Sequence, residues 1–248
     1  DNMKGSYLGP NYEQKNIEDE LINIGAKFTI LDEKELYNDT VEYLRDGQAV
    51  GWFQGRMEFG PRALGSRSIL GDPRSPKMQK NLNLKVKFRE SFRPFAPSIL
   101  QEDLSQWFDT NVKSPYMLFV SKIIKEKCIE MKQTEKNLFG IEKLNVKRSE
   151  IPAVTHVDYS ARIQTVDGKN NPNYFKLLTK FKEKTSCPIL INTSFNVRGE
   201  PIVNTPTDAF RCFMGTDLDV LVIGNCVLKK IDQDSSLKKD YKNLFELD

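Results

Sequence analysis

A fourteen-residue stretch, GRMEFGPRALGSRS from Gly55 to Ser68, limits most strongly what this chain can fold into. It holds Arg56, Arg62 and Arg67 among three glycines and a proline, and it has no apolar run that a core could use. Each guanidinium carries a fixed fork of N–H donors that matches phosphate or carboxylate oxygens, and glycine lets the backbone approach a ligand closely. We therefore expect an anion-binding loop; a solvated basic turn is the plainer interpretation.

The positive charge of the chain is concentrated around this loop. Residues 51–100 hold ten Lys/Arg and three Asp/Glu, a net charge of +7, whereas all 248 residues together carry only +3. A local excess of this kind is typical of a cleft that attracts an anionic ligand.

Four blocks of sequence resemble one enzyme family. In chain order they read GRMEFGPRALGSRSILGDPR, KFRESFRPFAPSIL, THVDYSARIQTV and ILINTSFNVRGEPIVNTP. They resemble the carbamoyltransferases of natural-product biosynthesis, which include the enzymes that carbamoylate tobramycin, cephamycins and nodulation factors. The resemblance runs from about Tyr7 to about Leu228. It implies the YrdC-like C-terminal domain of that family, which follows a larger transfer domain of the actin-like ATPase type.

The pattern of the chain predicts an α/β fold, with a mixed twisted sheet and flanking helices. We expect helices from a cap at Asn16 to Gly25, from a cap at Asp32 to Gly47, from Ser75-Pro76 toward Lys85, and over residues 173–184 and 207–213. We expect strands at residues 28–31, 49–53, 94–100, 116–124, 188–192, 220–223 and 227–229. The strongest strand signal, by β-branched and aromatic content, is that of residues 116–124.

The expected domain organisation is simple. Residues 1–15 are expected to be a linker from a missing upstream domain, because the chain begins Asp-Asn-Met and the family's larger half is absent from it. Residues 16–231 are expected to form one domain. The Lys-, Glu- and Asn-rich residues 125–149 are expected to be a mobile insert or lid, and residues 232–248 a polar tail.

Two short pairs of polar residues make a candidate phosphate site. Lys87 and Arg89 flank Phe88, and Ser194 and Asn196 flank Phe195. In an extended segment each pair would point to one face while its phenylalanine faces the core. Together they supply a point charge, a bidentate fork and neutral donors. Either pair alone is a weak signal; in the family, matching pairs bind the triphosphate of ATP.

Further candidates come from the same blocks, and each has a structural alternative. Arg93 needs a carboxylate or a ligand anion, and Glu90 or Glu58 would serve as the carboxylate. His156 is either a general acid or base or a histidine held by Asp158. The remaining roles follow from the resemblance or from position in the sequence. Arg67, Arg162 and Arg198 are expected to bind the nucleotide and its phosphates, and Arg56, Arg62 and Arg93 are expected to bind carbamoyl phosphate. Glu58 and Glu200 are expected to orient arginines.

The resemblance implies the reaction. Carbamoyl phosphate breaks down to carbamate, which attacks the α-phosphate of ATP to give carbamoyl-adenylate and pyrophosphate, and the upstream domain then carbamoylates an acceptor hydroxyl. Mg²⁺ is expected to accompany ATP. One alternative is a nucleic-acid-binding module, for which a net charge of +3 is low. Another is a domain that has lost catalysis and only docks to its transfer partner.

Composition bounds the remaining possibilities. One histidine and four cysteines without C-x-x-C spacing disfavour a metal site in this chain, and in the family the iron belongs to the missing domain. We expect reduced thiols and a cytoplasmic location. The sequence contains neither an apolar run long enough to span a membrane nor a secretory signal pattern.

Overall fold

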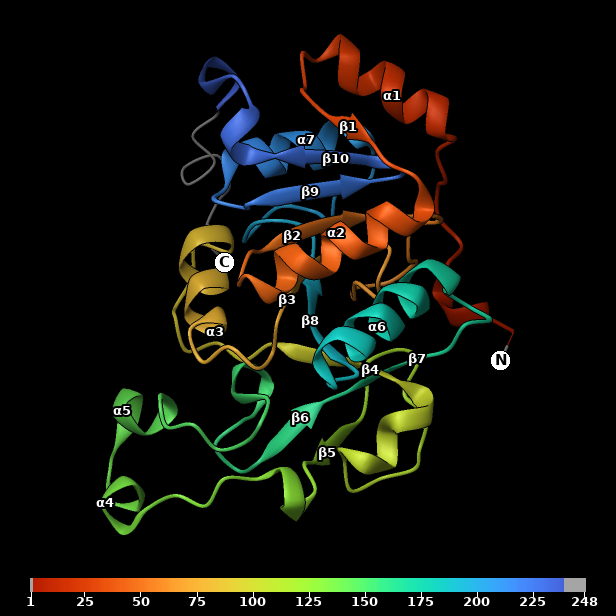
Figure 1. Cartoon of the computed structure of the whole chain (residues 1–248). Coiled ribbons are helices and arrows are strands. Elements are labelled where there is room, and N and C mark those ends of the chain that lie inside the picture. The colour runs from red at the N-terminus through yellow and green to blue at the C-terminus, as the bar shows by residue number, and fades with distance from the viewer. Residues whose placement is uncertain (1, 239–248) are drawn as a thin grey trace.

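The computed structural model describes residues 2–238, which are organised around one eight-stranded sheet (Figure 1). The strand order is β1-β10-β9-β2-β3-β8-β4-β7. The strands are β1 (Thr29–Ile30), β2 (Val50–Phe53), β3 (Arg67–Gly71), β4 (Ala96–Leu100), β7 (Gln164–Val166), β8 (Ile189–Ser194), β9 (Val220–Ile223) and β10 (Cys226–Lys229). The β2–β9 and β4–β7 pairs are parallel and the other neighbours are antiparallel, so the sheet is mixed, as predicted.

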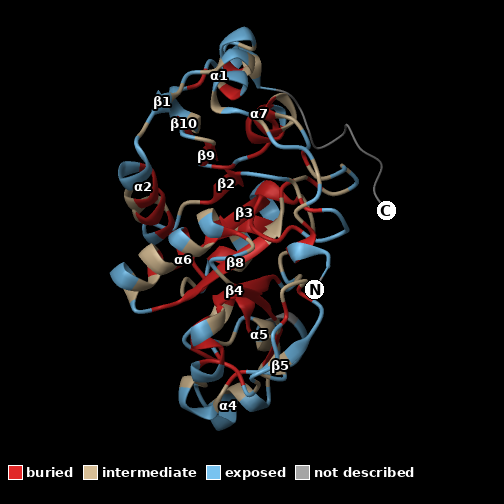
Figure 2. Cartoon of the chain, turned by 90° about the vertical axis from the view of Figure 1, so that its right-hand side faces the viewer, coloured by how far each residue is buried: buried red, intermediate tan, exposed pale blue. Residues whose placement is uncertain are grey.

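Helices cover both faces of the sheet. The longer ones are α1 (Gln14–Asn23), α2 (Glu33–Arg45), α6 (Pro172–Thr185) and α7 (Pro206–Gly215). Helices α2 and α6 pack side by side on one face, and α7 covers the other face with α1 packed against it (Figures 1 and 2). The central strands β2, β3 and β4 are buried along their whole length.

Local sequence explains where the longer helices begin. Asp32 accepts a hydrogen bond from the backbone of Glu35 and starts α2, as predicted. Asn171 caps α6 in the same way, and Thr205 forms a capping box with Asp208 at the start of α7. Helix α1 differs, since it begins at Gln14 after a Glu13 cap rather than at Asn16.

Two predicted elements differ from the structure. The strand predicted at residues 116–124 is reduced to β5 (Val120–Lys122), which is largely exposed and pairs only with β6 (Ser160–Arg162) in a separate two-stranded sheet. Leu118, Phe119 and Val120 are exposed, whereas Ile123 is buried in the main core, so β-propensity was misleading for most of the stretch. The helix predicted from Ser75 begins only at α3 (Met78–Asn81) and continues as a π turn, Leu82–Val86.

The sequence also gave no strand signal for β3, which is central in the sheet. Its first residue is Arg67, a charge that is unusual in a buried strand. The polar network around this arginine, described below, makes its burial possible.

Residues 125–149 form an excursion from the main body, at the end of the sheet that carries β4 and β7 (Figure 1). The segment contains the short helices α4 (Gln133–Lys136) and α5 (Gly140–Leu144). Short 3-10 turns complete the described chain, at Lys4–Ser6, Gln101–Gln106, Lys125–Lys127, Pro152–Val154, Lys230–Asp232 and Ser235–Leu237. The mobile lid remains a prediction, and most of the predicted polar tail lies outside the described residues. Among residues 2–238, no helix combines the length and the apolar character needed to cross a bilayer.

Candidate functional site

Lys87 is at the centre of a buried hydrogen-bonded set at the end of β8. The residue is only 3% exposed. Its Nζ donates to the backbone oxygen and Oδ1 of Asn196 at 2.8 and 2.7 Å, to Ser194 Oγ at 3.2 Å, and to the backbone oxygen of Ser194. The structure therefore brings Lys87 together with Ser194 and Asn196, which are 107 and 109 positions away in the sequence.

The neutral members of this set are also hydrogen-bonded to one another. Ser194 Oγ lies 2.7 Å from Asn196 Oδ1, and Asn196 Nδ2 donates to the backbone oxygen of Glu200 at 2.7 Å. The carboxylate of Glu200 in turn accepts from the backbone N–H of Val197 at 3.0 Å. A phosphate entering here would exchange some of these internal bonds for bonds to its own oxygens.

Burial lowers the pKa of Lys87 to about 7. The acceptors within hydrogen-bond distance of Nζ are neutral, so they compensate only partly for the loss of hydration. The nearby charge of Arg89 lowers the pKa further, whereas Glu200 acts in the opposite direction. The folded domain therefore holds this proton less tightly than the unfolded chain does, and an anion bound beside Lys87 would favour the charged form.

Arg89 presents an open guanidinium fork beside this set. Its Nε donates to Asn83 Oδ1 at 2.7 Å, and its guanidinium carbon lies 5.0 Å from the centre of the Phe95 ring. Its two terminal nitrogens make no hydrogen bond with any residue between 2 and 238. Burial, followed by the charge of Arg93, lowers the pKa of Arg89 to about 10. An oriented but unpaired fork is suited to bidentate binding of an anion.

These side chains line a cavity of about 360 Å³. The wall includes the candidates Lys87, Arg89, Arg93, Ser194, Asn196 and Arg198. Arg93 Nε lies 3.0 Å from Glu90 Oε2 on the rim, where both side chains are more than 40% exposed. Gly199, which follows Arg198, has a φ of 78°, a left-handed conformation that glycine adopts readily.

A second group of candidates forms around Arg162 on β6. Burial lowers the pKa of Arg162, and the charge of Arg62 lowers it further, so the two arginines are close enough to repel each other. Neither guanidinium group makes a hydrogen bond or ion pair with a described residue. Arg62 is exposed and Arg162 is half-buried. Guanidinium groups without a carboxylate partner among the described residues are suited to a site that binds an anion.

His156 belongs to the same neighbourhood. Burial, together with the charge of Arg162, lowers the pKa of its imidazole, and Asp158 opposes this effect. His156 stands at a turn, in which its backbone N–H donates to the backbone oxygen of Ser160. The carboxylate of Asp158 accepts from the N–H and Oγ of Ser160 rather than from the imidazole.

Two arginines of the Gly55–Ser68 loop are placed apart from these groups. Arg67 is fully buried, and its Nη1 donates to the backbone oxygens of Gln54, Gly55 and Ser66, so the structure favours a structural role for it rather than phosphate binding. Arg56 donates to the backbone oxygen of Gly9 at 2.9 Å and lines a different cavity from that of Lys87.

Glu58 holds the backbone of the loop in place. Its Oε1 accepts from the backbone N–H groups of Leu64, Ser66 and Arg67 at 2.7, 2.7 and 3.3 Å, instead of orienting a guanidinium as we expected. Glycine is needed at position 65 because the Tyr174 ring packs against its backbone: a Cβ there would lie 2.1 Å from that ring. The backbone at Gly65 therefore approaches another part of the protein closely, and not a ligand.

The pair geometry around Lys87 also corrects the sequence analysis. Lys87 ends the π turn with helical φ and ψ, and Phe88 has a φ of +47°, so this segment is a tight turn and not an extended strand. The turn is stabilised by backbone bonds from Lys87 to Leu82 and from Arg89 to Asn83. Ser194 does lie on a strand, β8, and Phe195 is fully buried as predicted.

Comparisons with known proteins identify the family. The family described as "Carbamoyltransferase C-terminus" matches residues 41–230. The nodulation protein NolNO of Sinorhizobium fredii is 41% identical over 90% of this chain and 31% of its own length. The 3'-hydroxymethylcephem-O-carbamoyltransferase of Streptomyces clavuligerus is 36% identical over 76% of this chain and 32% of its own length. The chain belongs to this carbamoyltransferase family.

The chain spans about a third of the length of these two relatives. An uncharacterised Synechocystis protein, sll1178, is 51% identical over the whole chain, which covers 41% of that protein. The crystal structure of full-length HypF in a phosphate- and nucleotide-bound form matches 79% of this chain and 22% of its own, with a TM-score of 0.48 and 15% identity.

Two positioning residues of this carbamoyltransferase domain escaped the sequence analysis. Asn83 orients Arg89 from the π turn, and Phe95 provides the ring beneath it. Phe95 stands inside one of the four family blocks, so its place in the sequence was a signal. Asn83 gave none, because its position opposite Arg89 depends on a turn that the sequence pattern does not reveal.

Proposed function

We propose that this carbamoyltransferase domain binds ATP and carbamoyl phosphate and forms carbamoyl-adenylate. The observation that carries the proposal is the open fork of Arg89, oriented by Asn83 and placed beside Lys87, Ser194 and Asn196 on one cavity. Family membership supports the carbamoyl part of the reaction. The nucleotide phosphates are assigned to the Lys87 cavity.

The carbamoyl phosphate end is assigned to Arg62 and Arg162, with Arg93 on the rim of the cavity. A water molecule hydrolyses carbamoyl phosphate to phosphate and carbamate, and a carbamate oxygen then attacks the α-phosphorus of ATP while pyrophosphate leaves. Negative charge is carried by phosphate oxygens at each step, so paired guanidinium groups stabilise it without acting as nucleophiles. Mg²⁺ enters with ATP as part of that substrate, bound by phosphates and water.

Transfer of the carbamoyl group to a hydroxyl is assigned to sequence outside this chain. The chain covers only about a third of the nodulation and cephem relatives, and within residues 2–238 no group of His, Cys, Asp and Glu could hold a metal ion. We propose that an upstream domain of the actin-like ATPase type carries out the transfer. We place the reaction in the cytoplasm, where ATP is supplied.

Calorimetric titration with Mg-ATP tests the proposal. Removal of the fork in Arg89→Met should weaken ATP binding by about tenfold or more, the effect of one or two charge-assisted hydrogen bonds. Arg211→Met, which changes an exposed arginine on α7, is the matched control and should bind like the wild type. Equal affinities of the two variants for ATP would exclude the Lys87 cavity as the nucleotide site. Tight binding of RNA with a steep salt dependence, and none of ATP, would favour a nucleic-acid-binding module instead.

A further inference from the structure

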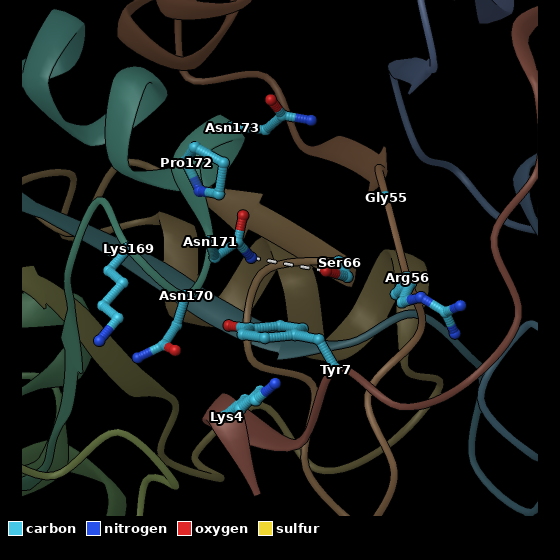
Figure 3. Close-up of a pocket in the computed structure, with 10 residues that line it drawn as sticks. All are labelled: Lys4, Tyr7, Gly55, Arg56, Ser66, Lys169, Asn170, Asn171, Pro172 and Asn173. Carbon is cyan, nitrogen blue, oxygen red and sulfur yellow. Dashed lines mark hydrogen bonds between the residues drawn. The ribbon is translucent and has the colours of Figure 1, made fainter. Parts of the chain in front are cut away.

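A second and larger cavity, of about 660 Å³, lies at the start of α6 (Figure 3). Three segments far apart in the sequence form it: the N-terminal turn with Lys4 and Tyr7, the loop residues Arg56 and Ser66, and residues 169–173 before and within α6. It has no lining residue in common with the Lys87 cavity. A volume of this size is in the range that holds a small-molecule ligand.

The wall of this cavity carries three cations and no carboxylate. The cations are Lys4, Arg56 and Lys169. Neither lysine side chain makes a hydrogen bond or ion pair with any residue between 2 and 238, and Arg56 is bonded only to a neutral carbonyl. The neighbouring carboxylate of Asp167 is already occupied by the backbone N–H groups of residues 169 and 170 and the amide of Asn170. These bonds leave the charge of Asp167 in place, but the three cations outnumber this neighbouring carboxylate, so the cavity carries a net positive charge.

The rest of the wall is suited to hydroxyl groups. Asn170, Asn171 and Asn173 contribute amides, and Asn171 Nδ2 lies 3.4 Å from Ser66 Oγ. Figure 3 shows the Tyr7 ring in the middle of the group, with Asn170 and Lys169 on one side and Arg56 on the other. The ring is fixed because Tyr7 Oη donates to the backbone oxygen of Leu64 at 2.8 Å. Amides can both donate to and accept from hydroxyls, and an aromatic face packs against a sugar ring.

We propose that this cavity binds a small phosphorylated, hydroxyl-rich molecule of the sugar phosphate class. The cations bind the phosphate, and the amides and the Tyr7 ring bind the hydroxyl-bearing part. The N-terminus of α6 is not needed for this assignment, since Pro172 has no N–H and Asn171 already caps the N–H of Tyr174. The site is separate from the proposed ATP site, so the two ligands bind without competing.

Titration with ribose 5-phosphate, inorganic phosphate and ribose, each alone, tests the assignment. Ribose 5-phosphate should bind, inorganic phosphate should bind at least severalfold more weakly, and ribose should give no heat. Lys169→Met should weaken ribose 5-phosphate binding about tenfold, as expected for one charge-assisted contact. The exposed Lys15→Met on α1 is the matched control and should leave the affinity unchanged.

Three results would overturn the proposal: wild-type affinity in Lys169→Met, equal affinity for inorganic phosphate and ribose 5-phosphate, or no binding of any probe. A competition titration separates this site from the proposed function. Saturating Mg-ATP should leave ribose 5-phosphate binding intact, and Arg89→Met should lose ATP but retain ribose 5-phosphate. One-for-one displacement by ATP would show that a single site takes both ligands and would also refute the proposal.

Discussion

Replacement of Lys87 by methionine should change how the stability of this domain depends on pH. Methionine keeps the apolar stem but removes the buried ammonium, whose pKa is lowered by burial to about 7. In the unfolded chain the same group titrates near its reference pKa of about 10.4. Below pH 7 the amine is protonated in both the folded and the unfolded state. Between pH 7 and about 10 the unfolded chain binds this proton and the folded domain does not. The free energy of unfolding of the wild type therefore rises with pH in that range.

The magnitude follows from the two pKa values. At 1.36 kcal/mol per pKa unit, this group should add about 2 kcal/mol to the wild-type free energy of unfolding between pH 7 and pH 9. Lys87→Met lacks this contribution. The absolute stability of the variant also reflects the carbonyls of Ser194 and Asn196 that lose their donor, and a comparison of pH dependences cancels most of that cost.

Urea unfolding of the wild type and Lys87→Met at pH 7 and pH 9 measures the difference. Lys85→Met is the matched control, because Lys85 is exposed and only two positions earlier; its pH dependence should follow that of the wild type. Parallel pH dependences for the wild type and Lys87→Met would refute the reasoning, since they would mean that the buried amine titrates normally.

Further predictions concern the same cavity and the residues around it. The dissociation constant of ATP should rise about tenfold from pH 7 to pH 8.5, because neutral Lys87 must take up a proton when the polyanion binds. Calorimetry in two buffers of different ionisation enthalpy detects that proton uptake, and a dissociation constant that does not change with pH would contradict the prediction. Asn83→Leu should weaken ATP binding threefold to tenfold by releasing Arg89, roughly the effect of one hydrogen bond, and an unchanged affinity would remove Asn83 from the site. Glu58→Met should lower the free energy of unfolding by about 2–4 kcal/mol, because it leaves buried N–H groups unpaired, and a urea midpoint equal to the wild type would show that the loop does not depend on Glu58. A thiol reagent should modify Cys128 in the folded domain, whereas the other three cysteines, which are buried, should react only after unfolding.

The sequence predicted the elements whose signals are local. Asp32 and Gly47 bound a helix in the sequence as they do in the structure, because caps and left-handed glycines act within a few residues. The strand predicted at residues 116–124 was too long, because a β-rich sequence does not determine how much of a segment pairs with another strand, and here only Val120–Lys122 does. The strand β3 was missed because its buried Arg67 is stabilised by groups distant in sequence, such as the carbonyl of Gln54.

The sequence predicted which residues belong to the candidate site better than it predicted how they are arranged. Spacing and resemblance selected Lys87, Ser194 and Asn196, and the structure places them in contact. The i, i+2 argument was wrong for Lys87 and Arg89, because the left-handed Phe88 turns the backbone between them. Such a turn is determined by the packing of the preceding π turn and not by the residue pattern.

The central proposal is that this domain makes carbamoyl-adenylate, and exchange of labelled pyrophosphate into ATP tests it most directly. Formation of the adenylate releases pyrophosphate, and the reverse step returns the label to ATP. We expect exchange with the wild-type domain only when carbamoyl phosphate is present, and its loss in Arg89→Met but not in Arg211→Met. No exchange with carbamoyl phosphate, under conditions in which the domain binds ATP, would contradict the proposal.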